Sequence, residues 1–253
     1  MKFDLVIQGP LNPTSLRNVN LISSQFENII ISYWSENDDS LLKQIVSKNV
    51  YFFHQPTPDL NNTVGVLKDS TFFYSIASTY LGLLQCKSPY VIKMRSDEIY
   101  ENFDPLKNLF LMDDSKFVFG NIFAKYWSLY LYHIGDHLFA CSRKNLTKTY
   151  EILHGLYTNE ADINTNSWAI QGIRSGSRWV QTAESILAKG FLKSKNIPEI
   201  TWDAPTTLTE NFNLIDIECL GKYQATWRHG NEAYSSEKNR FEWHIKTMAD
   251  ILL

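Results

Sequence analysis

The stretch YVIKMRSDEIY, residues 90–100, is more informative about fold and function than any other part of the chain. Its first half, Tyr90–Met94, is apolar enough for a buried strand, and it runs directly into the charged residues 95–98 (RSDE). In an open α/β sheet, ligands bind outside the carboxyl ends of the strands. A guanidinium beside carboxylates at such an end suits a diphosphate, held directly or through a divalent cation. A surface turn whose charges neutralise one another is the alternative.

Apolar runs alternate with helical patterns in the N-terminal half of the chain. Strands are predicted at Phe3–Gln8, Asn28–Trp34 and Val50–His54, ahead of Tyr90–Met94, and the longest helical pattern covers Gly65–Gln85. This alternation is typical of a layered, largely parallel sheet covered by helices. We therefore expect an α/β fold with a Rossmann-type sheet flanked by helices.

The second half of the chain is less regular. Its predicted strands are Phe117–Phe123, Leu138–Cys141 and Asn213–Ile217, and its predicted helices include one opening at Asp104-Pro105, Thr182–Phe191 and a closing one at Ser235–Leu253. No repeat, low-complexity tract or linker interrupts the chain, which predicts one domain over residues 1–253. Within it, residues 1–125 are expected to bind a nucleotide and residues 126–253 to shape an acceptor site.

Composition limits the classes of partner. The 253 residues are 44% hydrophobic and 20% charged, which is typical of a globular protein. Aromatic residues make up 14%, a fraction that suits a large binding cleft and a well-filled core equally. A formal net charge of −3 argues against nucleic-acid binding, which normally requires a basic face. A small phosphorylated ligand is still compatible, since one local arginine cluster suffices for it.

Cysteine usage and hydropathy predict the compartment. The three cysteines are far apart and form no C-x-x-C pair, as expected in a reducing environment. The N-terminus enters a strand at once without the apolar region of a signal peptide, and no apolar run is long enough to span a bilayer. We expect a cytoplasmic protein, with peripheral contact at the inner face of the cytoplasmic membrane left open. The sequence does not indicate the oligomeric state.

Several residues near the N-terminus are candidates for a nucleotide pocket. The first strand ends in Gln8-Gly9-Pro10, where a glycine allows close approach of backbone to a ligand and an amide can read a base edge; a plain turn is the alternative. Neither G-x-G-x-x-G nor a phosphate-binding P-loop is present. Arg17 faces either the same cleft or solvent. Trp34 either stacks on a nucleobase or belongs to the core.

Polar residues later in the chain allow both structural and chemical roles. Asn62, ahead of the long helix, is most simply a helix cap. Asp136 and His137 interrupt two apolar stretches, as a contact to an acceptor hydroxyl or as a turn with an Asx hydrogen bond. Arg228 and His229 combine a cation with a residue type that binds metals.

Glu184 opens a predicted helix in the sequence TAES. The positive end of the helix dipole favours its ionised form. An ionised carboxylate in a cleft can remove a proton from an attacking sugar hydroxyl. An ordinary glutamate in the first turn of a helix is the alternative.

The order of short motifs resembles a known family. VIQGPL, IIISYW, an asparagine pair before a long helix, KMRSDE, GDHLFACSRKNL and AESILAKGF follow one another between residues 3 and 195. Together they are similar to the WavE family of lipopolysaccharide-synthesis proteins, taken to be glycosyltransferases of the GT-A type. The resemblance implies a nucleotide-sugar donor and a polysaccharide, lipopolysaccharide or lipid-linked glycan acceptor.

The resemblance also implies roles for two motifs. Arg95–Asp97 (RSD) stands where GT-A enzymes carry a D-x-D motif that binds metal and diphosphate, and Glu184 stands where inverting members carry the general base. Arg95 replaces the first aspartate of D-x-D. In an extended segment residues i and i+2 share a face, so Asp97 is the only carboxylate on its side. With phosphate oxygens and waters, one carboxylate still suffices for Mg²⁺ or Mn²⁺.

The sequence therefore predicts a glycosyltransferase, with a nucleotidyltransferase acting on sugar phosphates and a non-catalytic glycan- or partner-binding protein of the same fold as alternatives. The candidate catalytic residues are Glu184 and Asp136. The candidate metal ligands, for Mn²⁺ or Mg²⁺, are Asp97 and His229. The candidate nucleotide-sugar-binding residues are Gln8, Gly9, Pro10, Arg17, Trp34, Asn62, Arg95, Ser96, Asp97 and Arg228.

Overall fold

The structure, a computed structural model, describes most of the chain. The described residues are 1–11, 13–34, 42–45, 47–55, 72–122, 124, 132, 134–158, 183–202, 204–221, 224–226, 233–235 and 247–252. The strands are β1 (Phe3–Gln8), β2 (Asn28–Tyr33), β3 (Val50–His54), β4 (Tyr90–Arg95), β5 (Glu98–Ile99), β6 (Phe117–Gly120), β7 (Phe139–Ser142), β8 (Phe212–Ile215), β9 (Gln224–Thr226) and β10 (Ala233–Ser235). The helices are α1 (Pro13–Ile22), α3 (Phe72–Gln85), α4 (Asp104–Met112), α5 (Arg143–Thr158), α8 (Ala183–Ser194), α9 (Pro205–Asn211) and α10 (Met248–Leu252).

Seven strands form the main sheet in the order β3-β2-β1-β4-β7-β6-β8. The four strands β3, β2, β1 and β4 are parallel to one another, and β6 is parallel to β8. Strand β7 is antiparallel to both of its neighbours, β4 and β6. All six residues of β1 are buried, as expected for a central parallel strand covered on both faces. The predicted α/β fold with a Rossmann-type sheet is confirmed.

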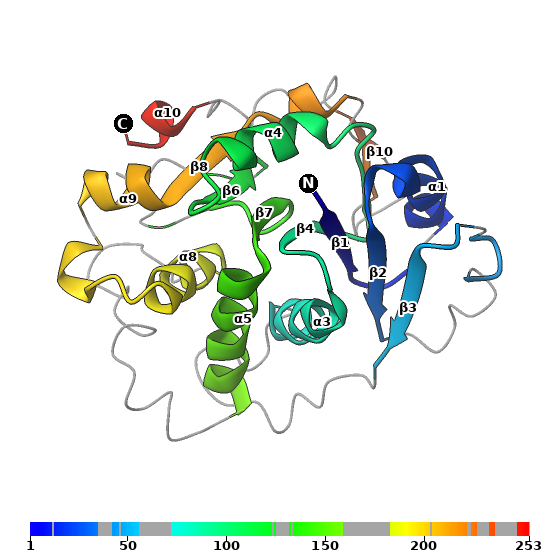
Figure 1. Cartoon of the computed structure of the whole chain (residues 1–253), viewed down its shortest axis with the longest axis horizontal. Coiled ribbons are helices and arrows are strands. Elements are labelled where there is room, and N and C mark those ends of the chain that lie inside the picture. Colours follow the sequence, from blue (N-terminus) through cyan, green and yellow to red (C-terminus); the bar gives the residue numbers. More distant parts are fainter. Residues whose placement is uncertain are drawn as a thin grey trace.

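Helices cover both faces of this sheet (Figure 1). Alternate residues of β1 show the division, because Leu5 and Ile7 pack with α1 and α4 whereas Val6 packs with α3, α5 and α8. Each face therefore has its own hydrophobic core, and the sheet is the middle layer of three.

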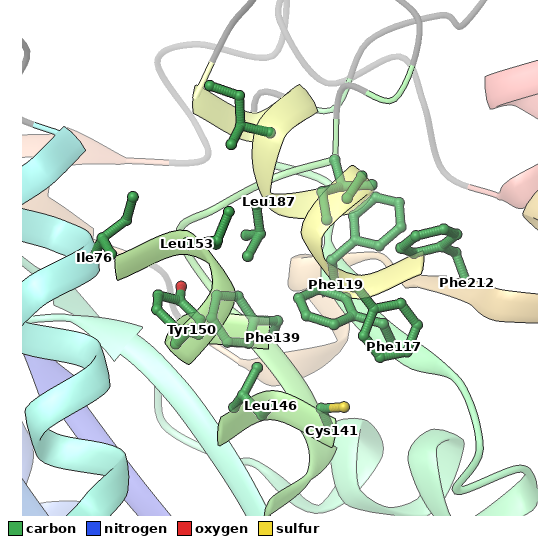
Figure 2. Close-up of a cluster of buried hydrophobic side chains, with 14 of the residues drawn as sticks. Ile76, Phe117, Phe119, Phe139, Cys141, Leu146, Tyr150, Leu153, Leu187 and Phe212 are labelled. Carbon is green, nitrogen blue, oxygen red and sulfur yellow. The ribbon is translucent and has the colours of Figure 1, made fainter. Parts of the chain in front are cut away.

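The core under α5 and α8 is strongly aromatic (Figure 2). The rings of Phe117 and Phe139 lie 4.8 Å apart, and Phe191 of α8 packs edge-on against Phe117 at 5.1 Å. Phe212 of β8 joins Phe191 at 5.4 Å. Tyr150 of α5 stacks on Phe139 at 6.2 Å. Much of the aromatic content thus fills the core, one of the two alternatives that composition left open.

Most predicted elements occur close to their expected bounds. Two predicted strands match β1 and β3 residue for residue, and the run at Tyr90–Met94 continues through Arg95. The strand expected at Phe117–Phe123 ends at Gly120. The side chain of the next residue, Asn121, accepts a hydrogen bond from the backbone N–H of Ile217 at 3.1 Å. The long helix begins by Phe72 in the described residues, while 65–71 lie outside them.

The closing helix predicted at Ser235–Leu253 is wrong at its start. Ser235 belongs to β10, which pairs with β9 in a small second sheet of the order β10-β9-β5. Helical structure is described only at Met248–Leu252. Among the described helices, none combines the length and hydropathy that a membrane span requires.

Candidate functional site

Two sequence motifs, Gln8-Gly9-Pro10 at the end of β1 and Arg95–Asp97 at the end of β4, lie side by side at the carboxyl edge of the sheet. Strand β1 lies between β2 and β4, so the chain builds the sheet in one direction through β2 and β3 and then returns to the other side of β1. This reversal is a topological switch point, where open α/β sheets bind ligands outside the carboxyl ends of their strands. The register pairs Gln8 with Arg95 at that edge.

Gly9 and Ser96 join the two strand ends. The backbone N–H of Ser96 donates to the carbonyl of Gln8 at 2.9 Å, and its hydroxyl donates to the carbonyl of Pro10 at 2.6 Å. Gly9 has a φ of +125°, and a Cβ there would lie 2.6 Å from the Ser96 hydroxyl oxygen. A glycine is thus required at position 9. Ser96, predicted as a ligand-binding residue, is nearly fully buried and fastens the loop after β1 to the loop after β4.

Arg95 and Asp97 form a forked ion pair immediately after β4. Nε and Nη2 of Arg95 donate to the two carboxylate oxygens of Asp97 at 2.9 and 2.7 Å. Burial alone would raise the pKa of Asp97, but the hydrogen bonds and charge of Arg95 lower it overall. Burial alone would lower the pKa of Arg95, yet its bonds to Asp97 raise it overall. Both groups are therefore ionised, and the arginine side chain is still 34% exposed.

Asp136 and His137 lie beside this pair, although 40 residues separate them from it in sequence. Nδ1 of His137 bonds to Oε1 of Glu98, and Nε2 of His137 lies 3.6 Å from Oδ1 of Asp136. The charge of Asp136 acts on the pKa of Arg95, which places its carboxylate in the same electrostatic neighbourhood. Gly135 permits this approach, because a Cβ there would lie 2.6 Å from the carbonyl oxygen of Gly120.

Lys93 is a member of this neighbourhood that sequence reasoning missed. Its side chain is fully buried, its ammonium donates to the backbone carbonyl of Asp136, and it lies 5.3 Å from the ring centre of Phe139. Burial lowers the pKa of Lys93 to about 8, against the opposing charge of Asp136. A lysine inside the otherwise apolar strand YVIKM was the signal, since lysines are almost never fully buried without a partner.

The ends of β1 and β2 meet α3 through aromatic and polar contacts. Trp34, directly after β2, stacks on Tyr74 of α3 with ring centres 5.4 Å apart and an angle of 24°. The amide oxygen of Gln8 accepts a hydrogen bond from the hydroxyl of Ser75 at 3.2 Å. Two of the predicted nucleotide-pocket residues thus lie along the same helix at the carboxyl edge of the sheet.

Arg17 and Glu184, two further predicted site residues, lie on helices α1 and α8. Arg17 is exposed on α1. Glu184 lies in the first turn of α8, as predicted, and is partly buried. The ammonium of Lys189, also on α8, lies 5.4 Å from the ring centre of Tyr132, which brings this helix to the segment that leads to Asp136.

Three predicted residues lie outside the described part of the chain: Asn62, Arg228 and His229. Strand β9, which ends at Thr226 just before Arg228, pairs with β5 so that Ala225 is opposite Glu98.

The described residues do not fit a metal ion on their own. Both carboxylate oxygens of Asp97 accept hydrogen bonds from Arg95. Within the described ranges, no three His, Cys, Asp or Glu side chains lie close enough together to share a cation. Divalent cations of the Mg²⁺ type prefer carboxylate oxygens that no cation already holds.

Comparisons with known proteins add little to this geometry. No family model matches the chain, and none of the curated proteins matches it, so the resemblance to WavE proteins stays a prediction. Among solved structures, HddC from Yersinia pseudotuberculosis is 16% identical, with 58% of this chain and 79% of that chain covered and a TM-score of 0.38. A 4-diphosphocytidyl-2C-methyl-D-erythritol synthase from Anaerococcus prevotii is 14% identical, with 76% and 99% covered and a TM-score of 0.42.

A third solved structure is a glucosyl-3-phosphoglycerate synthase from Mycobacterium tuberculosis in complex with Mg²⁺ and uridine diphosphate. It is 15% identical, with 61% of this chain and 63% of that chain covered and a TM-score of 0.41. Likeness at this level carries no information on activity, which has to come from the residues of this chain.

Proposed function

We propose that the protein is a glycosyltransferase that moves a sugar from a nucleotide-sugar donor to a hydroxyl of a cell-surface polysaccharide or lipopolysaccharide acceptor. The observation that carries the proposal is the Arg95–Asp97 pair at the switch point between β1 and β4, beside Gly9. A partly exposed guanidinium held rigid by a carboxylate, next to backbone without a side chain, suits a diphosphate.

Each part of the site has a role in the proposed donor complex. Arg95 faces the diphosphate and neutralises charge that grows on it as it leaves. Asp97 keeps the guanidinium in place. Gln8 and Trp34 line the nucleoside side, where the indole and the Tyr74 ring already form a stack. Pro10, Arg17, Asn62, Ser96 and Arg228 are the further donor-side candidates.

The proposed reaction is attack of an acceptor hydroxyl oxygen on the anomeric carbon of the donor sugar. The new carbon–oxygen bond forms as the bond to the diphosphate breaks, and the nucleoside diphosphate takes the electron pair. In an inverting reaction the hydroxyl proton goes to Glu184 in the first turn of α8, whose dipole favours the ionised form. Asp136 contacts the donor sugar or the acceptor from the neighbouring segment.

The first test is product formation by the full chain from UDP-, GDP-, CMP- and dTDP-sugars with an added glycan acceptor. Release of the nucleotide from one donor supports the proposal, and Asp97→Asn should abolish it while the fold is kept. Asp114→Asn is a matched control, since that carboxylate is exposed and bonds only a tyrosine hydroxyl among the contacts described for it. Pyrophosphate release from a nucleoside triphosphate and a sugar phosphate would instead indicate a nucleotidyltransferase, and no turnover of any donor would indicate a binding protein.

The second test concerns the general base. Glu184→Gln should keep donor affinity and lose about 10²–10⁴-fold in turnover, the usual contribution of a general base. Turnover at saturating donor is measured together with the anomeric configuration of the product by NMR. Unchanged turnover, or retention of configuration, would remove Glu184 from this role.

The third test concerns the cation. The described residues around Arg95 and Asp97 do not form a complete cation site. If Asp97 and His229 nevertheless bind Mn²⁺ or Mg²⁺, as the sequence predicts, EDTA removes most of the activity and either ion restores it. Full activity in chelator assigns the counter-charge to Arg95 alone.

A further inference from the structure

A line of buried polar side chains leads from the interior to Asp136. The hydroxyl of Tyr100 donates to Oε2 of Glu98 at 2.9 Å, and Oε1 of Glu98 bonds Nδ1 of His137. Nε2 of His137 lies 3.6 Å from Oδ1 of Asp136. Side-chain exposure rises along this line, from 0% at Glu98 to 8% at His137 and 14% at Asp136. Asp136 is the end that reaches toward the Arg95–Asp97 pair.

Burying the Glu98 carboxylate lowers the stability of the fold unless hydrogen bonds compensate for its lost hydration. Taking a carboxylate out of water is compensated only by good hydrogen bonds, and apolar residues of similar size commonly fill such space at no loss of stability. Both oxygens of Glu98 are engaged, one by a phenol and one by an imidazole. A carboxylate in this position gives the imidazole a fixed orientation, which an apolar side chain would not.

The hydrogen-bond roles follow from the chemistry of the groups. A carboxylate oxygen without a hydrogen only accepts, so a bond of this kind to Glu98 is made by an Nδ1–H of His137, and the other ring nitrogen is turned to Asp136, whose carboxylate it attracts when it also carries a hydrogen. The backbone of Asp136 is fixed separately, because Lys93 donates to its carbonyl and Gly135 packs against the carbonyl of Gly120.

We propose that Glu98, supported by Tyr100, is a positioning residue that holds the ring of His137 against Asp136 and thereby directs the Asp136 carboxylate at the reacting sugar. The inference rests on the proposed function. Glu98 and Tyr100 are too deeply buried to touch substrate, so they act only through His137. The logic is that of a catalytic group oriented by a hydrogen-bonded imidazole and acid behind it.

The first arm of the test needs no substrate. Long-range ¹H–¹⁵N NMR of the full chain, with the His137 signals assigned from a His137→Gln variant, reports which ring nitrogen carries the hydrogen. The wild type should show a hydrogen on Nδ1. In Glu98→Gln this hydrogen should be partly lost, since an amide can accept from Nδ1 or donate to it. A wild-type ring without a hydrogen on Nδ1 would overturn the proposal.

The second arm is kinetic and uses the donor that the nucleotide-sugar panel identifies. Glu98→Gln should lower kcat about 10- to 100-fold, the effect of small misplacement of a reacting group, with KM for the donor within about twofold. Tyr100→Phe should lower kcat by less. Tyr90→Phe is the matched control, because it also removes a phenol–carboxylate hydrogen bond, to exposed Asp114, at the opposite end of β4.

The two proposals fail in distinguishable ways. Activity in the wild type, none in Asp97→Asn and an unchanged kcat in Glu98→Gln would overturn the positioning role and leave the glycosyltransferase intact. A lower melting temperature with unchanged kcat per folded molecule would make Glu98 merely structural, which also overturns it. If no donor is turned over, the proposed function fails and with it the kinetic role.

Discussion

The lowered pKa of the buried Lys93 predicts that the stability of the protein rises with pH in the alkaline range. Burial lowers its pKa from 10.5 to about 8 in the folded protein. Between these two values the unfolded chain binds a proton at this lysine and the folded chain does not. Stability rises with pH wherever the unfolded state binds more protons. The free energy of unfolding should therefore gain a contribution from Lys93 as pH rises through the window from about 8 to 10.5.

The size of the effect follows from the two pKa values. The full difference is roughly 3 kcal/mol, at 1.36 kcal/mol for each pKa unit, and no discount for solvent applies because the group is fully buried. Between pH 7 and pH 9 the expected share is about 1.4 kcal/mol. Above that range Cys141 acts in the opposite sense, since burial raises its pKa to about 12.

The measurement compares wild type with Lys93→Met, a substitution of similar volume, by urea unfolding at pH 7 and pH 9 under reducing conditions. Subtracting the unfolding free energy of the variant from that of the wild type removes the contributions that cysteines and tyrosines make to both. The difference in unfolding free energy should shift by about 1.4 kcal/mol in favour of wild type at the higher pH. Lys193→Met, at a half-exposed lysine, controls for the loss of one charge. A pH-independent difference would refute the reasoning.

Three further predictions concern the stability of single variants, two of them at the ends of β1 and one in α5. Gly9→Ala should lose about 1–3 kcal/mol by urea unfolding, because the residue has a positive φ and the new Cβ meets the Ser96 hydroxyl. Gly155→Ala, in an α5 position with open space, should gain about 0.5–1 kcal/mol. Asp4→Asn should lose about 2–4 kcal/mol in the same assay, because its buried carboxylate accepts four hydrogen bonds and an amide turns a donor toward two of them.

Each of these has an outcome that contradicts it. Equal stability of the two glycine variants would mean that the loop after β1 adjusts without strain. Asp114→Asn, at an exposed acid, is the control for Asp4→Asn and should change stability by less than about 0.5 kcal/mol. Equal losses at the two aspartates would mean that burial of Asp4 does not matter.

The parallel half of the sheet was predictable because its strands are short, apolar and separated by helices. Phe3–Gln8 and Val50–His54 are short apolar runs of this kind, and the structure reproduces their bounds. The position of β7 between β4 and β6 was not predictable, since nothing in the local pattern of Phe139–Ser142 distinguishes an antiparallel insertion from a further parallel strand. Strand order depends on tertiary packing, which local periodicity does not report.

Sequence reasoning named the charged residues at this edge of the sheet and did not connect the buried ones behind them. Arg95 ends β4 and Asp97 follows in a turn, and their side chains bond each other directly. Glu98 bonds His137, and this contact joins residues 39 positions apart. Sequence reasoning treated His137 and Glu98 separately because only the folded chain brings them together. A lone lysine in a buried strand, Lys93, was the one signal that was present and not used.

The small sheet β10-β9-β5 connects residues 224–235 to the candidate site. Strand β5 is only Glu98–Ile99, and it pairs with Ala225 and Gln224 of β9, which in turn pairs with Ala233–Ser235 of β10. A chain cut before residue 224 would keep every strand of the main sheet but leave the backbone of Glu98 without this neighbour. Activity lost on such trimming would therefore not show that the removed residues bind substrate. Changes in the segment of residues 224–235 can therefore alter the position of Glu98, the residue that bonds His137.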